Sequence, residues 1–243
     1  MTAPSGPDSW SDEQGTNRTS GRLIAIAVGF GTPEVRALAD WLIANDHILR
    51  AILDATLSNP DRLAAVRNTG LLDGARHPAI DNIAEMTAEA IGANAASVSL
   101  VLDDGEIVVG CNEPESEYPR SGTLDMSLSK FVVVSGEPLI VGDATRHPLL
   151  ADQPAVRAGT LRAFAGIPLA DGSGTVVGTL SVWDSDPHDW TASQIQLLHD
   201  LTDVTCASIF GDSAFLPPAV SAPPVGRTSG KLKGFVGRRR RGP

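Results

Sequence analysis

The sequence predicts an α+β fold, in which an antiparallel sheet carries helices on one face. Short strand-like runs are joined by tight turns, at Asp104-Gly105 and again from Asp171 to Gly174. Hairpins of this kind build antiparallel sheets. Amphipathic helical patterns stand before and after these runs, which is typical of helices segregated to one side of such a sheet.

The first half of the chain predicts four helices and a hairpin. Thr32-Pro33-Glu34 is a strong helix start, and a second apolar pattern follows up to Asn59-Pro60. A third helix is expected from there to Gly70, and a fourth from Pro78 to Gly92. Alternation of apolar and polar residues then predicts a strand in which Val98, Leu100 and Leu102 share one face and Ser97, Ser99 and Val101 the other, followed by a strand with Ile107, Val109 and Cys111.

The second half predicts an irregular loop over residues 113–125 and a short helix within residues 127–135. A strand (PLIVGD) and a long connector over residues 144–160 come next, then two strands around the Asp171–Gly174 turn. In the last strand, Val176, Leu180 and Val182 are expected on one face. A final helix begins at Thr191, where Gln194 completes a capping box.

Composition divides the chain into four parts. Residues 1–20 have a disordered composition, residues 21–58 form a helical extension, residues 59–211 form the main domain, and residues 212–243 form a Pro-rich linker and a basic disordered tail. The extension either packs on the main domain or mediates dimerisation or linkage.

Charge is distributed unevenly along the chain. The formal net charge is −10, yet seven of the 19 Lys and Arg residues lie within residues 227–243, which contain no acid. An acidic body repels nucleic acid, whereas the tail could make weak, salt-sensitive contact with polyanions. No signal peptide or membrane-spanning run is apparent, so we expect a cytoplasmic protein.

The sequence resembles the GAF family of small-molecule sensory domains over about residues 59–211. The resemblance rests on five motifs in order: RLAAVRNTGLLD, SLSKFVVVSGEPLIVGDATRHPLLADQPAV, AGIPL, VVGTLSVWD and DWTASQIQLLHDL. It implies an antiparallel sheet of five or six strands, with N- and C-terminal helices packed on one face. It also implies that loops and short helices enclose a ligand on the other face.

Departures from the family's patterns reduce the number of ligand classes that the resemblance leaves open. Ser127 and Ser129 stand where related sensory sequences often carry the cysteine that binds a bilin, and the NKFDE-type signature of cyclic-nucleotide binders is not apparent. Sulfoxide-reducing members use thiols on pocket loops, whereas Cys111 and Cys206 fall in a predicted strand and helix. The cofactor therefore stays unknown.

Candidate ligand-binding residues lie in the connector and on the strand face opposite the helices. Asp143 and Arg146 either set ligand polarity or make a turn cap and a surface ion pair. Arg162 beside Phe164 suits an anionic or planar ligand, or else an exposed ion pair. Thr179, Ser181 and Trp183 share a mixed face, where Trp183 is either a stacking platform or a core residue. The candidate set is Asp143, Arg146, Arg162, Phe164, Thr179, Ser181 and Trp183.

The five histidines are scattered without metal-ligand spacing, and we expect neither a metal site nor catalytic residues. We therefore expect a non-enzymatic sensory or regulatory domain in signal transduction. It would bind a small molecule or form a homodimer through its terminal helices, and so modulate a separate signalling protein. The alternatives are a thiol-dependent reductase and a nucleic-acid-binding or anion-binding protein that acts through its tail.

Overall fold

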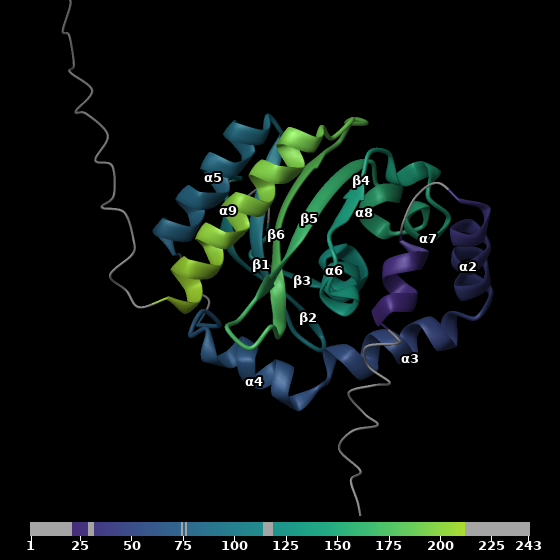
Figure 1. The fold of residues 1–243 in the computed structure, drawn as a ribbon, viewed down its shortest axis with the longest axis horizontal. Coiled ribbons are helices and arrows are strands. Elements are labelled where there is room, and N and C mark those ends of the chain that lie inside the picture. The colour runs from purple at the N-terminus through teal and green to yellow at the C-terminus, as the bar shows by residue number, and fades with distance from the viewer. Residues whose placement is uncertain (1–20, 29–31, 74, 76, 114–118, 212–243) are drawn as a thin grey trace, which may run out of the picture.

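The computed structural model describes residues 21–28, 32–73, 75, 77–113 and 119–211. The predictions for residues 1–20 and 212–243 lie outside this part of the chain. One sheet forms the centre of the molecule, with helices on both of its faces (Figure 1). The α+β class predicted from the hairpin and helix patterns is confirmed.

The longer helices begin and end near the residues that the sequence signals predict, but the predicted connector over residues 144–160 contains three short helices. Thr32 caps the first helix of the extension with its hydroxyl, and Asn59 caps the first helix of the main domain with its side-chain carbonyl. A helical segment over residues 21–27 precedes them. The longer helices are α2 (Pro33–Ala44), α3 (Asp46–Leu57), α4 (Pro60–Asn68), α5 (Pro78–Ile91) and α9 (Ala192–Phe210). The short ones are η1 (Leu124–Met126), α6 (Ser129–Ser135), η2 (Ala144–Arg146), α7 (Pro148–Ala151) and α8 (Pro154–Arg157).

The sheet contains six antiparallel strands in the order β3-β2-β1-β6-β5-β4. Their bounds are β1 (Ala95–Val101), β2 (Gly105–Cys111), β3 (Ser121–Thr123), β4 (Leu139–Val141), β5 (Ala163–Ala170) and β6 (Val176–Asp184). The sequence prediction of an irregular loop over residues 113–125 was wrong for β3. This strand is three exposed residues long and carries no apolar alternation, so only its pairing with the edge of β2 defines it.

The β1–β2 hairpin is confirmed, but its turn is shifted by one residue. The Leu102 N–H donates to the Gly105 carbonyl, so Asp103 and Asp104 are the central residues of the turn and Gly105 already belongs to β2. Pairing of Gly105 with Thr123 of β3 fixes this register.

Different helices cover the two faces of the sheet (Figure 1). α5 and α9 pack against each other and on β1, β2 and β5, over a core that includes Val98, Leu180 and Leu198. On the opposite face, α6 contacts β1, β5 and β6, and the core there includes Phe131 and Phe164. The packing of terminal helices on one face is therefore confirmed for α5 and α9.

The extension packs on this second face. α3 contacts α6, and α2 contacts α7, so both extension helices lie outside the short helices (Figure 1). Leu42, Leu49 and Leu57 of the extension are buried in the same core as Phe131. Of the two roles left open for residues 21–58, the structure shows packing on the main domain.

A β-bulge changes the expected pattern at the start of β6. Leu169 pairs with Gly178, but Ala170 pairs with Val176, which leaves Val177 as the extra residue. Val177 therefore joins Leu180 and Val182 in the core beneath α5 and α9, while Val176 packs with the opposite core. The prediction that Val176 shares a face with Leu180 was wrong, because a bulge puts two consecutive side chains on one side.

Within the part of the chain that the structure describes, no helix combines the length and the apolar character needed to cross a lipid bilayer.

Candidate functional site

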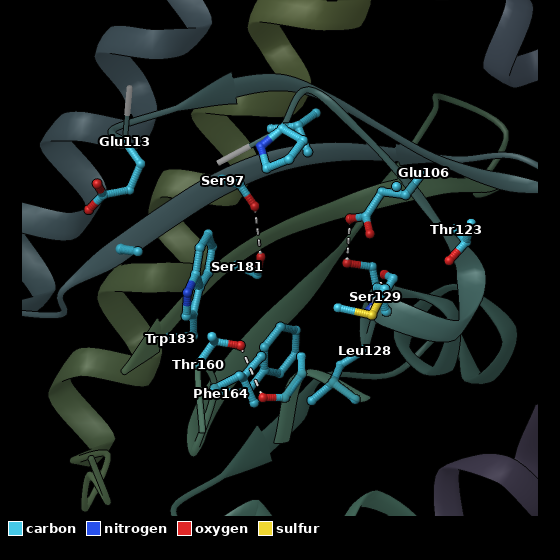
Figure 2. A pocket seen from close by; sticks show the side chains of 18 of the residues that line it. Ser97, Glu106, Glu113, Thr123, Leu128, Ser129, Thr160, Phe164, Ser181 and Trp183 are labelled. Carbon is cyan, nitrogen blue, oxygen red and sulfur yellow. Dashed lines mark hydrogen bonds between the residues drawn. The ribbon is translucent and has the colours of Figure 1, made fainter. Parts of the chain in front are cut away.

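A cavity of ≈ 610 Å³ lies on the sheet face opposite α5 and α9, where the sequence predicts a pocket (Figure 2). This size is in the range of small-molecule sites. Strands β1, β2, β5 and β6 form its floor, and β3, η1, α6 and α8 enclose it. Its lining includes Ser97, Glu106, Val108, Ser127, Leu128, Ser129, Ala155, Thr160, Leu161, Phe164, Ser181 and Trp183.

Serine hydroxyls form the centre of the floor. Ser97 and Ser181 are directly opposite each other on β1 and β6, and their hydroxyl oxygens are 3.3 Å apart. The Ser97 hydroxyl also lies 3.4 Å from that of Ser99, so the three hydroxyls form a chain along the sheet. Since each hydroxyl can donate one bond and accept two, the hydroxyls of Ser97 and Ser181, which line the cavity, can pair with a polar group of a ligand.

A carboxylate lies on another side of the cavity. Glu106 of β2 accepts a hydrogen bond of 2.9 Å from the Ser129 hydroxyl at the start of α6. Ser129 is oriented in turn by its own N–H, which donates to the Ser127 hydroxyl. All three residues are buried, and Figure 2 shows Glu106 and Ser129 facing each other across the gap between the sheet and α6. The carboxylate is thus held in place at the cavity wall.

Two aromatic side chains make the apolar wall. Phe164 and Trp183 are paired neighbours on β5 and β6. Gly166 lets the Phe164 ring lie over its own strand, because a Cβ at that position would collide with the ring. In Figure 2 Trp183 and Glu106 lie on opposite sides of the cavity. A flat apolar body can therefore contact the rings while a polar end reaches the carboxylate.

Lys130 supports the cavity from behind its wall. Its ammonium group donates to the Leu124 carbonyl at 2.8 Å and to the Gln153 side-chain oxygen at 3.0 Å, which joins α6 to η1 and to the connector before α8. Burial lowers the pKa of Lys130 to about 8, against the opposing attraction of Asp125 and Glu106. The segments that enclose the cavity are therefore tied together by one buried cation.

The model of the GAF domain family matches residues 75–209, which is more than half of the chain. The chain belongs to the GAF domain family. The resemblance drawn from the five motifs, and the fold it implies, are confirmed.

Solved structures of GAF domains resemble this one at low sequence identity. The GAF domain of a phosphoenolpyruvate-protein phosphotransferase from Acinetobacter is 19% identical, with 62% of this chain and 96% of that chain covered and a TM-score of 0.42. A free methionine-R-sulfoxide reductase from Neisseria meningitidis, in complex with its substrate, is 18% identical, with coverage of 66% and 89% and a TM-score of 0.46. GAF3 from Slr1393 of Synechocystis, in its photoproduct state, is 17% identical, with coverage of 53% and 89% and a TM-score of 0.43. No curated protein matches the chain.

The sequence-predicted site residues of this GAF domain fall into three groups. Phe164, Ser181 and Trp183 line the cavity. Thr179 is fully buried in β6, and its hydroxyl finds no hydrogen-bond partner among the described residues. Asp143, Arg146 and Arg162 are not part of the lining.

The last of these groups contains an ion pair between Arg162 and Asp143. Arg162 donates from Nε and from a terminal nitrogen to the two oxygens of Asp143, at 3.1 and 3.2 Å. Hydrogen bonds from Arg162, and then from the Thr145 hydroxyl, hold the pKa of Asp143 at about 2. Arg146 is exposed in η2. Of the alternatives for Asp143 and Arg162, the structure shows the turn cap and the ion pair, since Asp143 caps η2. Among the described residues, Arg146 does not make the ion pair that was its alternative.

Among the cavity residues that were not predicted are three that make its polar contacts: Ser97, Glu106 and Ser129. Their signal was present in the sequence. Alternation along the strand places Ser97 on the other face of the sheet from Val98. In the next strand it places Glu106 on the other face from Ile107 and Val109. A carboxylate on the face of a predicted strand that is turned away from the helices is a stronger pocket candidate than a charge in a connector.

Neither thiol of this GAF domain is among the residues that line the cavity, although Cys111 pairs with the floor residue Ser97. Cys111 is buried at the end of β2, and Cys206 is half-buried in α9; neither lines the cavity. Burial raises the pKa of both thiols, which disfavours the reactive thiolate. No group of three or more metal-ligating side chains gathers among the residues that the structure describes.

Proposed function

We propose that this GAF domain is a non-enzymatic sensory or regulatory domain that binds a small molecule in the cavity and modulates a partner protein in signal transduction. The observation that carries the proposal is the ≈ 610 Å³ cavity, which combines an apolar wall with a few oriented polar groups. Preformed sites for small molecules have this composition.

Helix α6 offers a route from the cavity to the surface. Its first residue, Ser129, bonds the cavity carboxylate, and the body of the helix packs on α3 of the extension. A ligand that binds one position of α6 more tightly would make that position more populated. Because α3 packs on α6, the extension would shift with it, and a partner protein could recognise the change. The basic tail lies outside the described residues, so weak polyanion binding through it stays a prediction, as does a cytoplasmic location.

Homodimerisation through the terminal helices is part of the proposal. α5 and α9 pack side by side and expose Met86 and Val204, which are 59% and 50% accessible. Covering such side chains with a second copy would favour association.

Native mass spectrometry of the freshly purified full chain tests ligand binding and dimerisation together. We expect a non-covalent small-molecule adduct, released on mild activation, on a species of twice the chain mass. A bare chain of monomer mass would contradict both parts of the proposal.

The runner-up function is a thiol-dependent reductase. It predicts that sulfoxide reduction is present and is lost when Cys111 and Cys206 are changed to serine. We expect no reduction of free methionine sulfoxide by the wild-type chain, because neither thiol lines the cavity and burial raises the pKa of both. Activity that disappears in the Cys111→Ser, Cys206→Ser variant would overturn the non-enzymatic proposal.

A further inference from the structure

In the described part of the chain, the charged side chains that line the cavity are all acidic. Its lining contains two acidic residues, Glu106 and Glu113, and no Lys, Arg or His among the described residues. An anionic ligand would leave water for a site without a cationic partner, which carries a large desolvation cost. The cavity therefore disfavours anions, although a strand arginine beside an aromatic had suggested one.

Glu106 has unused hydrogen-bonding capacity. It is 8% exposed, and the Ser129 hydroxyl is its one hydrogen-bond donor among the described residues. A carboxylate accepts several bonds, and a buried one is stabilised by further donors, above all charged ones. One oxygen of Glu106 is thus available to a donor that enters the cavity.

Lys130 does not fill this role. Its ammonium group is close enough to Glu106 for the carboxylate to favour its charged form. It nevertheless makes its hydrogen bonds with Leu124 and Gln153, and it forms no ion pair with Glu106. The Lys130 charge is used to hold the cavity wall, and the carboxylate remains open on the cavity side.

The other walls of the cavity indicate the shape of a ligand that could pair with Glu106. Phe164 and Trp183 suit a planar body, and ring faces attract cations. The Ser97–Ser181 hydroxyl pair can take a second polar group. We propose that the cavity binds a planar, positively charged molecule whose amidinium or guanidinium group pairs with Glu106 while its flat body lies along the aromatic wall. This rests on the proposed function and names the ligand class of that site.

Three isosteric probes test the charge preference by titration calorimetry on the full chain at neutral pH. Benzamidine, benzamide and benzoate share a size and a planar shape, and they carry a positive, zero and negative charge. We expect benzamidine to bind at least about tenfold more tightly than benzamide, since hydrogen bonds to charged groups are the stronger ones. We expect benzoate not to bind.

Glu106→Gln keeps the shape of the side chain and removes its charge. We expect it to weaken benzamidine binding at least about tenfold and to bring it near the affinity of benzamide. Glu89→Gln, at an exposed position of α5 on the other side of the sheet, is the matched control and should leave all three affinities unchanged. Thermal denaturation of both variants checks that the fold is intact.

The outcomes separate this inference from the proposed function. Binding of benzoate in preference to benzamidine, or equal loss in both variants, overturns the charge preference while the cavity still binds small molecules. If none of the probes binds but the purified protein retains a small molecule, the ligand class is wrong and the function stands. If no probe binds and the purified chain is bare, both are wrong.

Discussion

Replacing Arg62 with methionine is expected to lower the free energy of unfolding by about 3 kcal/mol, because the buried carbonyls of Leu57 and Val101 lose a charged donor while that of Thr56 keeps backbone donors. Arg62 is 5% exposed, and its guanidinium donates to the carbonyls of Thr56, Leu57 and Val101 at 3.2, 2.6 and 2.7 Å. Burial lowers its pKa to about 10, so the group stays charged at neutral pH.

The position of these carbonyls explains the size of the effect. Thr56 and Leu57 end α3, where helical carbonyls have no partner within the helix and carry partial negative charge. Val101 ends β1 in the middle of the sheet. One side chain therefore caps the extension and fastens it to the main domain.

Urea denaturation followed by circular dichroism measures this loss. Arg67→Met changes the same residue type at an exposed position of the same helix, and it should stay within about 0.5 kcal/mol of wild type. If Arg62→Met were as stable as Arg67→Met, the hydrogen bonds from Arg62 to the three carbonyls would contribute nothing to stability and the role assigned to Arg62 would be wrong.

Gly178→Ala is expected to destabilise the sheet by about 3 kcal/mol, the upper end of the range that is typical when a buried position is overpacked. Gly178 lies in β6, opposite Leu100 of β1 and next to the bulge at Val177. A Cβ at Gly178 would overlap the backbone carbonyl of Ser99. That carbonyl belongs to a central strand, so relief requires β1 and β6 to separate.

Gly172→Ala is the matched control, because a Cβ there has no atom within 4 Å and its backbone does not need a positive φ. We expect its Tm to equal that of wild type and the Tm of Gly178→Ala to fall by roughly 6–12 °C. Similar Tm values for the two variants would contradict this prediction, because they would show that β1 and β6 can separate at Gly178 at little cost in stability.

The sequence allowed the order of elements to be predicted because local signals set it. Caps at Thr32 and Asn59, the Thr191 capping box and the alternation in β1 all act between neighbours in the chain. Strand β3 was missed, since its three residues become a strand only by pairing with β2. The bulge at Val177 was missed for the same reason, because it is defined by the register against β5.

The candidate site shows the same division. Alternation correctly identified the sheet face that carries Phe164, Ser181 and Trp183. It could not show that Arg162 is occupied by Asp143, nor that Ser129 would meet Glu106, because those partners are 19 and 23 residues apart in the sequence. Sequence reasoning therefore placed charged residues near the connector, such as Asp143 and Arg146, in the pocket. In the structure a charged residue of the pocket is Glu106, which comes from β2.

The most direct test of the account is native mass spectrometry of the wild-type chain beside a variant with the cavity filled. Ser181→Phe places a ring on the cavity floor, and Thr160→Trp, at an exposed lining position, serves if the first variant fails to fold. We predict a small-molecule adduct on the wild-type chain and its loss from the folded variant. An adduct that is equally abundant on both chains would contradict the claim that this cavity is the binding site.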